Sequence, residues 1–335
     1  MLQGGVELVV FLNSLEDIVY DDIISVENLL LAWEDFLCGK RKRKDVQKFQ
    51  VNLMDNILKL HSDLKHKIYV HGAYEAFNIS DPKPRNIHKA SVRDRLLHHS
   101  IYRVLYPAFD SNFISHSYSC RKSKGTHKAL DAFATFARKA SRNHTVTVWV
   151  LKCDIKKFFA SIDHEILMSI FTQKMLDRDT LWLLSRVIES FETASVKGLS
   201  LGNLTSQLFV NIYMNEFDQF MKHECGVKYY IRYADDFVIL SLDKQYLENL
   251  LVQIQQFLEK KLLLQLHPHK VSISTFTSGV DFLGWVHFPH CRVLRIVTKR
   301  RMLKNIKGVA VDSPTVQSYL GMLQHGDTHK IIHNF

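Results

Sequence analysis

The residues of this sequence best suited to chemistry are two adjacent aspartates, Asp235 and Asp236. They separate two apolar runs that favour β-strands, 229–233 and 237–240, so the pattern predicts a tight hairpin with acid at its tip. Aspartate pairs are also ordinary turn residues, because their side chains bond to nearby backbone groups. A third carboxylate, Asp154, ends another apolar run, and three carboxylates would converge if these runs were neighbouring strands.

Carboxylates that converge repel one another, and each raises the pKa of the others unless a cation neutralises them. Hard divalent cations such as Mg²⁺ take oxygen ligands and commonly bring substrate phosphates with them. Two such ions about 4 Å apart stabilise the attacking and leaving oxygens of an in-line displacement. The three aspartates therefore favour two Mg²⁺ ions and phosphoryl-transfer chemistry.

The composition is that of a globular and basic chain. Its 335 residues, 46% of them hydrophobic, allow two or three subdomains around a sizeable core. The net charge of +10 indicates a polyanionic partner. Positive residues gather at 40–44 and 292–307, where we favour contact with phosphates over a merely solvated helix end.

Several classes of protein are disfavoured. No apolar run approaches the roughly 20 residues that span a bilayer, and the apolar patch 6–12 has no basic lead-in, which argues against a signal peptide. The five cysteines show no metal or redox spacing, and the histidines show no zinc-protease pattern. We therefore expect a cytoplasmic protein with free thiols and no membrane partner.

Helical periodicity and capping residues predict how the chain begins. In an N-terminal helical extension, 1–66, Ser25 would cap a helix over 26–38 and Asp45 would cap a helix over 46–65. Further short strands and helices are expected in the order β within 68–87, α 91–106 ending at Pro107, and α 126–142.

The following elements must position the aspartates. They are expected in the order β 145–154, α 164–176, α 180–192, a Gly-bearing loop, α 206–224, β 228–233, β 236–242, α 244–261 and β 271–276. Without the inserted helices the order is βαββαβ, the split ferredoxin-like unit. In that topology the first strand pairs beside the central hairpin, so Asp154 would meet Asp235. Helices near 299–307 and over 314–324 would close this α/β (α+β) chain.

These residues resemble those of the reverse transcriptases. Tyr-Ala-Asp-Asp at 233–236, preceded by Asp-Ile-Lys-Lys-Phe-Phe at 154–159, is similar to the palm of that family. The likeness runs from about Trp33 to the C-terminus, through ordered matches at 83–85, 93–95, 117–121, 198–207 and 282–284. It implies a right-hand polymerase with fingers at 67–144, a palm at 145–290 that has a fingers-like helical insertion at about 164–200, and a short basic helical thumb at 291–335.

The resemblance implies RNA-directed DNA polymerase activity, in which a 3′-hydroxyl attacks the α-phosphate of a deoxynucleoside triphosphate (dNTP) and releases pyrophosphate. Asp154 and Asp235 would be the main metal ligands, together with the backbone carbonyl of Ile155. Because successive strand residues face opposite ways, Asp236 would approach the metals less directly. Its catalytic part could be to position the primer terminus or the hairpin.

Other matches imply contacts with the substrate. Lys83 and Arg85 match fingers residues that hold the triphosphate, although a solvated loop is the plain alternative. Phe159 matches an aromatic steric gate that excludes the ribose 2′-hydroxyl, while one of Phe158 and Phe159 must be core. Lys270 matches a late palm lysine that could protonate pyrophosphate, although a surface strand lysine is nearly as good an interpretation.

A further match implies a primer grip. It consists of Phe282, Leu283 and Gly284, followed by Trp285. A glycine at this place allows close approach of another backbone.

The segment 199–207 discriminates best among reverse transcriptases. Retroviral and group II intron enzymes usually have Gln-Gly here and end the motif Ser-Pro, whereas this chain has Leu201-Gly202 and ends Ser206-Gln207. Leucine removes a polar side chain that contacts the sugar and templating pair, so the site should reject wrong bases poorly. This form is similar to that of diversity-generating retroelement enzymes, which copy a template-repeat RNA into cDNA with errors at adenine.

Family analogy also implies partners: template RNA, the cDNA/RNA hybrid, and a small, basic, helical oligomeric accessory protein. The nearest alternatives are other prokaryotic reverse transcriptases. A group II intron enzyme should keep Gln-Gly and extend into a maturase domain, and a retron enzyme should show Asn-Ala-x-x-His and Val-Thr-Gly. An abortive-infection defence enzyme is harder to separate. The intact Asp154, Asp235 and Asp236 argue against a catalytically silent RNA-binding module.

Overall fold

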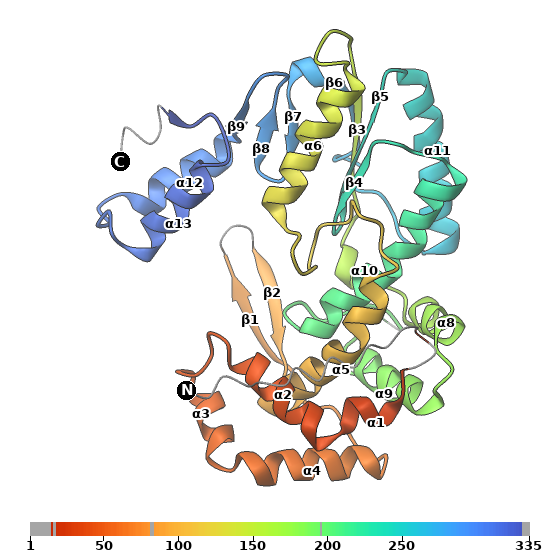
Figure 1. Cartoon of the computed structure of the whole chain (residues 1–335), viewed down its shortest axis with the longest axis vertical. Helices are drawn as coiled ribbons and strands as arrows, with labels where there is room; N and C mark the ends of the chain where they lie inside the picture. Colours follow the sequence, from red (N-terminus) through yellow and green to blue (C-terminus); the bar gives the residue numbers. More distant parts are fainter. Residues whose placement is uncertain (1–14, 16–17, 81–83, 195, 330–335) are drawn as a thin grey trace, which may run out of the picture. The chain divides into compact units, whose positions relative to one another are not determined.

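The computed structural model describes residue 15 and residues 18–80, 84–194 and 196–329 (Figure 1). The chain divides into two compact units, each built from separate stretches of sequence. Unit 1 comprises Met1–Phe113 and Lys157–Glu216, and unit 2 comprises Ile114–Lys156 and Phe217–Phe335. Lys83 and the apolar patch 6–12 lie outside the described residues. The division into extension, fingers, palm and thumb stays a prediction.

Unit 1 is mainly helical. Its helices are α1 (Tyr20–Ile24), α2 (Val26–Leu37), α3 (Lys44–Val51), α4 (Leu53–Lys65), α5 (Val92–Asp110), α7 (Phe158–Ser161), α8 (His164–Lys174), α9 (Arg178–Glu189) and α10 (Leu204–Gln219), whose last residues belong to unit 2. Buried apolar residues such as Leu29 and Phe36 of α2 and Leu97 of α5 form its core. Strands β1 (Glu75–Ile79) and β2 (Arg85–Lys89) pair antiparallel.

Some boundaries in unit 1 differ from expectation. The Ser25 cap is confirmed, because its Oγ accepts a hydrogen bond of 3.2 Å from the amide of Asn28. The single helix over 46–65 is wrong: it is divided at Asn52, whose φ of −117° and ψ of 45° are not helical. Asp45 is not the N-cap, because it lies within α3, whose N-cap is Arg43. Its Oδ1 accepts a hydrogen bond of 3.0 Å from the amide of Val46, and its Oδ2 binds Arg95 Nη2 at 2.7 Å and Lys89 Nζ at 3.0 Å.

Pro107 does not end its helix either. Helix α5 continues to Asp110 with Pro107 inside it. A proline within a helix removes one backbone hydrogen bond, but the residues that follow it, Ala108 and Phe109, are buried. Burial of apolar surface therefore outweighs the missing bond.

Unit 2 contains the predicted ferredoxin-like sheet. Strands β3 (Trp149–Asp154), β4 (Tyr230–Tyr233), β5 (Asp236–Ser241) and β6 (Ser272–Thr275) are antiparallel in the order β4-β5-β3-β6. Helix α10 precedes β4, and helix α11 (Lys244–Lys261) lies between β5 and β6 in the sequence. The βαββαβ order is therefore confirmed, and β3 lies beside β5 of the central hairpin.

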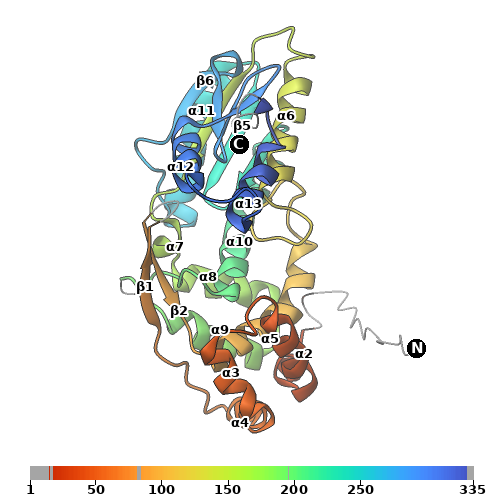
Figure 2. The same ribbon diagram turned by 90° about the vertical axis from the view of Figure 1, so that its left-hand side faces the viewer.

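Helices cover both faces of this sheet (Figure 2). On one face, Leu130 and Phe133 of α6 (Thr126–Ala140) share a core with Val238 and Leu240 of β5. Helix α11 packs against the same sheet through β3, β5 and β6, and Figures 1 and 2 place it on the side away from α6. Because side chains alternate along β5, those on one face pack toward α6 and those on the other face pack toward α11.

The remainder of unit 2 follows β6. A π-helical turn (Phe220–Glu224) extends α10, and a 3₁₀ turn (Phe276–Ser278) leads to β7 (Val280–Phe282), β8 (Trp285–His287), β9 (Arg292–Leu294), α12 (Ile296–Ile306) and α13 (Pro314–Leu323). The two predicted C-terminal helices are confirmed as α12 and α13. The small sheet β7-β8-β9 was not foreseen. Among the helices of the described chain, none combines the length and apolar character needed to cross a bilayer.

Candidate active site

The predicted acidic hairpin is present in unit 2. Tyr233 pairs with Asp236 in the β4–β5 ladder, so Ala234 and Asp235 form the connecting loop. Short hairpin loops require a positive φ, and Ala234 adopts a φ of +55°. This conformation is costly for a residue with a Cβ. The tightness of the turn therefore fixes where Asp235 lies.

The β3–β5 ladder brings the third carboxylate to the same place. Asp154 lies directly opposite Asp236, and the amide of Ile155 donates a hydrogen bond of 3.1 Å to the carbonyl oxygen of Asp235. Asp154 is only 7% exposed. The convergence of the three aspartates expected from the sequence is therefore found within one unit.

Asp235 and Asp236 are not successive residues of one strand, contrary to expectation. The alternation of side chains applies along a strand, but Asp235 lies in the loop, and Asp236 is the residue in the ladder. Directly opposed residues of antiparallel strands point to the same face. Asp236 and Asp154 therefore share a face, and the separate role of each aspartate stays a prediction.

The electrostatics of the site reflect this crowding. Burial, followed by the charges of Asp236 and Asp154, raises the pKa of Asp235 from 3.8 to about 6. Lys270 acts in the other direction and lowers that pKa. Its Nζ lies 2.8 Å from each carboxylate oxygen of Asp154. The ammonium group of Lys270 therefore supplies a positive charge beside the three aspartates.

Lys270 reaches Asp154 from a loop that is tied to the end of β3. Ile155 forms an isolated bridge with Leu266, and the amide of His267 donates to the Asp154 carbonyl oxygen at 2.7 Å. Lys270 precedes β6 rather than lying in it. The interpretation of Lys270 as a surface strand residue is therefore wrong, whereas its role toward pyrophosphate stays a prediction.

The donor set fits a hard divalent cation. In the described residues no three His, Cys, Asp or Glu side chains already surround a metal position. However, Asp154, Asp235 and Asp236 offer only oxygen atoms, the donors that Mg²⁺ prefers. Burial, followed by the charges of Asp236 and Asp154, raises the pKa of Asp235, and a bound cation would relieve the repulsion among the three carboxylates. The predicted ligands, including the carbonyl of Ile155, suit the ion chemically.

The predicted primer-grip residues form another turn of unit 2. Phe282 pairs with Trp285 across β7 and β8, so Leu283 and Gly284 make a hairpin loop with φ of +50° and +88°. Phe282 is fully buried, and its ring lies 5.6 Å from that of Phe133. The structure therefore gives Phe282 a core position and leaves Leu283 and Gly284 at the turn.

The remaining described candidates belong to unit 1. Phe158 of α7 is buried, whereas Phe159 is partly exposed, which confirms that one of the two rings is core. The Phe159 carbonyl oxygen accepts a hydrogen bond of 2.8 Å from the amide of Leu199. This bond links the candidate steric gate to the start of the segment 199–207.

The Leu201-Gly202 turn packs against strand β2, at whose exposed start Arg85 lies. The amide of His88 donates to the Leu201 carbonyl oxygen at 3.0 Å. Gly202 has a φ of +113°, and a Cβ there would lie 2.9 Å from Ile87 Cγ2. Only glycine fits both the conformation and the space. Gln207 lies half-buried in the first turns of α10.

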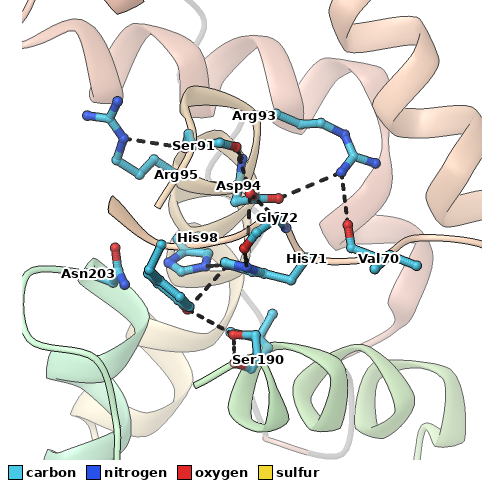
Figure 3. Close-up of polar contacts among 12 residues, drawn as sticks. Val70, His71, Gly72, Ser91, Arg93, Asp94, Arg95, His98, Ser190 and Asn203 are labelled. Atoms are coloured by element: carbon cyan, nitrogen blue, oxygen red, sulfur yellow. Dashed lines mark hydrogen bonds and ion pairs between the residues drawn. The ribbon is translucent and has the colours of Figure 1, made fainter. Parts of the chain in front are cut away.

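A buried polar network connects His98 of α5 with Thr205 of α10, and Figure 3 shows the part of it around Asp94 and His98. His98 Nδ1 and Thr205 Oγ1 are 3.2 Å apart, as are His98 Nε2 and His71 Nε2. Burial, followed by the charge of His71, lowers the pKa of His98 to about 3. His98 is therefore neutral and has one donor and one acceptor for its two partners.

Asp94 anchors the same network. It is 1% exposed, and its carboxylate accepts hydrogen bonds from the Tyr69 hydroxyl at 2.8 Å and the Ser91 hydroxyl at 2.6 Å. Arg95, which belongs to the match at 93–95, binds Asp45. Sequence reasoning missed this network. The cap residue Ser91 was its only signal, because the other partners are distant in sequence.

Comparison with known proteins concerns the candidate residues of both units. The family model described as reverse transcriptase (RNA-dependent DNA polymerase) matches residues 80–287, which include all the described candidate residues. This chain belongs to the reverse transcriptase family. Reverse transcriptase domains generally use divalent metal ions and dNTPs, and the mixed helix-and-sheet fold agrees with such a polymerase.

Curated relatives of this reverse transcriptase are distant. It is 26% identical to Protein YkfC of Escherichia coli over 61% of this chain and 63% of that protein. It is 24% identical to an uncharacterized 91 kDa protein in the cob intron of Schizosaccharomyces pombe, over 63% of this chain and 29% of that protein. A putative COX1/OXI3 intron 2 protein of Saccharomyces cerevisiae is 17% identical over 60% and 30%. The chain therefore spans less than two thirds of each relative.

Proposed function

We propose that this chain is an RNA-directed DNA polymerase that copies a template-repeat RNA into error-prone cDNA for a diversity-generating retroelement. The observation that carries the polymerase activity is the convergence of Asp154, Asp235 and Asp236 at the end of paired strands, where burial and then the charges of Asp236 and Asp154 raise the pKa of Asp235. Carboxylates perturbed in this way are typical of functional sites, and a bound cation would relieve their repulsion.

The chain's own residues would act as follows. Asp154 and Asp235, with Asp236 and the carbonyl of Ile155, would hold two Mg²⁺ ions, which would stabilise the attacking 3′-hydroxyl and the leaving oxygen. Lys270, held 2.8 Å from Asp154, carries a proton that it could give to departing pyrophosphate. A phosphodiester forms at the α-phosphate as the bond to pyrophosphate breaks.

Residues of unit 1 would select the nucleotide. Arg85, and Lys83 outside the described residues, would contact the triphosphate, and the partly exposed ring of Phe159 would exclude a 2′-hydroxyl. The backbone oxygen of Leu201 accepts a hydrogen bond from His88, and the side chain that Leu201 would present to a templating pair is apolar. An apolar contact tests shape but no hydrogen-bonding pattern, which supports the error-prone subgroup.

An intron-type reverse transcriptase is the second candidate. Its support is that the names of two relatives refer to introns, one in cob and one in COX1/OXI3. The Leu201 and Gln207 departures from Gln-Gly and Ser-Pro favour the retroelement. Neighbouring DNA distinguishes the two, since a retroelement requires near-duplicate repeats that differ where one copy has adenine.

The proposal includes template RNA, the cDNA/RNA hybrid and a small basic helical accessory protein as partners. Two charge patterns suit the nucleic acids: the net charge of +10 and the basic helix α12. All five cysteines lie in the described residues as free thiols, which supports a reducing, cytoplasmic location.

The first experiment measures dNTP incorporation on an RNA template with Mg²⁺. Asp235→Asn should abolish synthesis and leave RNA binding intact, because it removes a metal ligand and keeps the side-chain volume. Asp312→Asn, an exposed carboxylate of the same unit, serves as the control and should retain synthesis. Synthesis by Asp235→Asn at the wild-type rate would refute the assignment of the site.

The second experiment tests the subgroup. Leu201→Gln should lower misincorporation opposite template adenine, because it restores a polar contact at the turn, whereas Leu201→Met keeps an apolar one and serves as the control. Sequencing of cDNA products gives the error spectrum. An unchanged spectrum in Leu201→Gln would remove this explanation of infidelity.

A further inference from the structure

A hollow of about 400 Å³ lies in unit 2 at the opposite end of the sheet from the aspartates. Residues at its wall include Ser241, which ends β5, the strand that Asp236 begins. Five strand steps of about 3.3 Å place the hollow roughly 17 Å along the sheet from the acidic end. It is therefore separate from the site described above. Its volume lies within the range of about 300–1,000 Å³ typical of ligand sites.

Cations from different elements meet at this hollow. Lys139 and Arg142 come from the end of α6 and the turn after it, and Lys228 precedes β4. All of them are exposed, and within the described residues none forms an ion pair with a carboxylate. Basic residues at a helix C-terminus are favoured by the helix dipole, but this does not explain Lys228. Asp243, the cap of α11, is the nearest acid in sequence to the wall.

The turn that carries Arg142 is unusual. Arg142, Asn143 and His144 have consecutive φ values of +49°, +58° and +68°. The amide of Asn143 donates to the Arg138 carbonyl at 2.9 Å, and the amide of His144 donates to Ser141 Oγ at 2.9 Å. The turn is thus fixed by its own bonds, and its amides are occupied. Backbone conformations of this kind are disfavoured and concentrate at functional sites.

Aromatic rings complete the wall. The Tyr229 ring is half-buried and held edge-on against Phe136, with ring centroids 5.3 Å apart. The Tyr246 side chain on α11 is 39% exposed. Lys228 Nζ lies 5.3 Å from the centre of the Tyr229 ring. Rings on which bases stack, bordered by cations that contact phosphates, form the combination by which proteins bind single-stranded nucleic acid.

We propose that this hollow binds an unpaired RNA segment, with a base stacked on Tyr246 beside Tyr229 and phosphates at Lys139, Arg142 and Lys228. The choice of RNA over DNA rests on the proposed function, in which a structured template RNA is the lasting partner. The site would hold that RNA at a distance from the aspartates and leave the template strand free to move through the active site.

The test measures binding of unpaired oligouridine RNA to full-length protein that carries Asp235→Asn, so that synthesis is not needed for the readout. The pocket variant is Arg142→Ala with Lys228→Ala. Its matched control is Lys260→Ala with Lys261→Ala, which removes two exposed cations at the end of α11 in the same unit. Each lost phosphate contact should lower the slope of log affinity against log salt by about 0.7, so the pocket variant should lose about 1.4 and the control should lose none.

Stacking is tested separately at Tyr246. Tyr246→Leu should weaken oligouridine binding at least about fivefold, the lower end of a base-stacking contribution, while Tyr246→Phe keeps the ring and the affinity. RNA that carries 5-iodouridine should crosslink to Tyr229 or Tyr246. Equal salt slopes for pocket and control variants, crosslinks elsewhere in the chain, or equal binding of duplex RNA would each overturn the proposal.

This test separates the site from the polymerase proposal. If the wild-type protein makes no DNA but its RNA binding depends on the pocket, the proposed function fails and the site stands. If synthesis depends on Asp235 while pocket and control variants bind RNA alike, the RNA-binding hollow is refuted and the polymerase proposal is not. Oligothymidine that binds as well as oligouridine, with the same dependence on Arg142 and Lys228, would overturn the choice of RNA.

Discussion

Asp235→Asn is expected to make the metal-free protein more stable while it abolishes synthesis. The carboxylate of Asp235 is partly buried beside the charges of Asp236 and Asp154, and both conditions disfavour its ionised form. Asparagine has nearly the same shape and carries no charge. Replacement of a residue with a structural role should lower the free energy of unfolding of the protein, whereas replacement of one retained for metal binding should raise it.

The size of the effect follows from the pKa of Asp235, which is raised from 3.8 to about 6. Because the folded state holds this proton more tightly than the unfolded chain, the stabilising contribution is fully present below about pH 4 and is lost as the pH rises through 6. A shift of about two pH units corresponds to about 3 kcal/mol. Solvent screening at a partly exposed group reduces this, so we expect a gain of about 1–3 kcal/mol for Asp235→Asn at neutral pH.

Urea unfolding with a chelator, at a series of pH values from about 4 to 8, measures this gain. The free energy of unfolding of the wild type should fall between about pH 4 and pH 6 relative to that of Asp235→Asn, and the two should converge at the acid end. Asp312→Asn, the exposed control, should follow the wild type. Added Mg²⁺ should then stabilise the wild type more than Asp235→Asn, because a ligand stabilises the state that binds it.

The reasoning is refuted if Asp235→Asn lowers the free energy of unfolding at neutral pH, or if its pH profile runs parallel to that of the wild type. Either result would mean that the ionised carboxylate is satisfied in the metal-free fold. The crowding of the three aspartates would then no longer support a cation site.

Two further predictions concern other positions. Phe159→Ala should admit ribonucleoside triphosphates in primer extension, because the partly exposed ring would no longer meet a 2′-hydroxyl; unchanged sugar selectivity would return Phe159 to a packing role. Arg232→Met should lower the free energy of unfolding by about 3–5 kcal/mol in urea, because it leaves Asp218 buried without the partner that now lies 2.6 Å away. A loss below about 1 kcal/mol, the value of an exposed pair, would contradict the second prediction.

The sequence predicts the four-stranded sheet of unit 2 well because its signals are local. Runs of alternating and β-branched residues locate β3, β4 and β5, and the βαββαβ order alone then determines which strands are neighbours. Helix α11 agrees with its expected range over 244–261. This topology places Asp154 beside the tip of the central hairpin, as expected, whereas the ladder sets it opposite Asp236 rather than Asp235.

Predictions from the sequence fail where contacts between residues far apart in the chain determine the structure. The break at Asn52 and the continuation of α5 through Pro107 depend on which side chains other helices bury. The contacts of His98 with His71 and Thr205 join residues far apart in the chain, and no periodicity marks them. For Asp236 the sequence pattern did not determine the register, since a shift of one residue between loop and strand changes which side chain shares a face with Asp154.

Lys270 connects the observed electrostatics to the proposed chemistry. Its ammonium occupies both carboxylate oxygens of Asp154, so a divalent cation and Lys270 would compete for the same oxygens. The Lys270 side chain is 42% exposed and can move into solvent, whereas Asp154 is fixed at the end of β3. Asp154, Asp235 and Asp236 would hold the metal ions, which would supply charge stabilisation for phosphoryl transfer. Lys270 neutralises Asp154 in the metal-free fold and could give a proton to departing pyrophosphate.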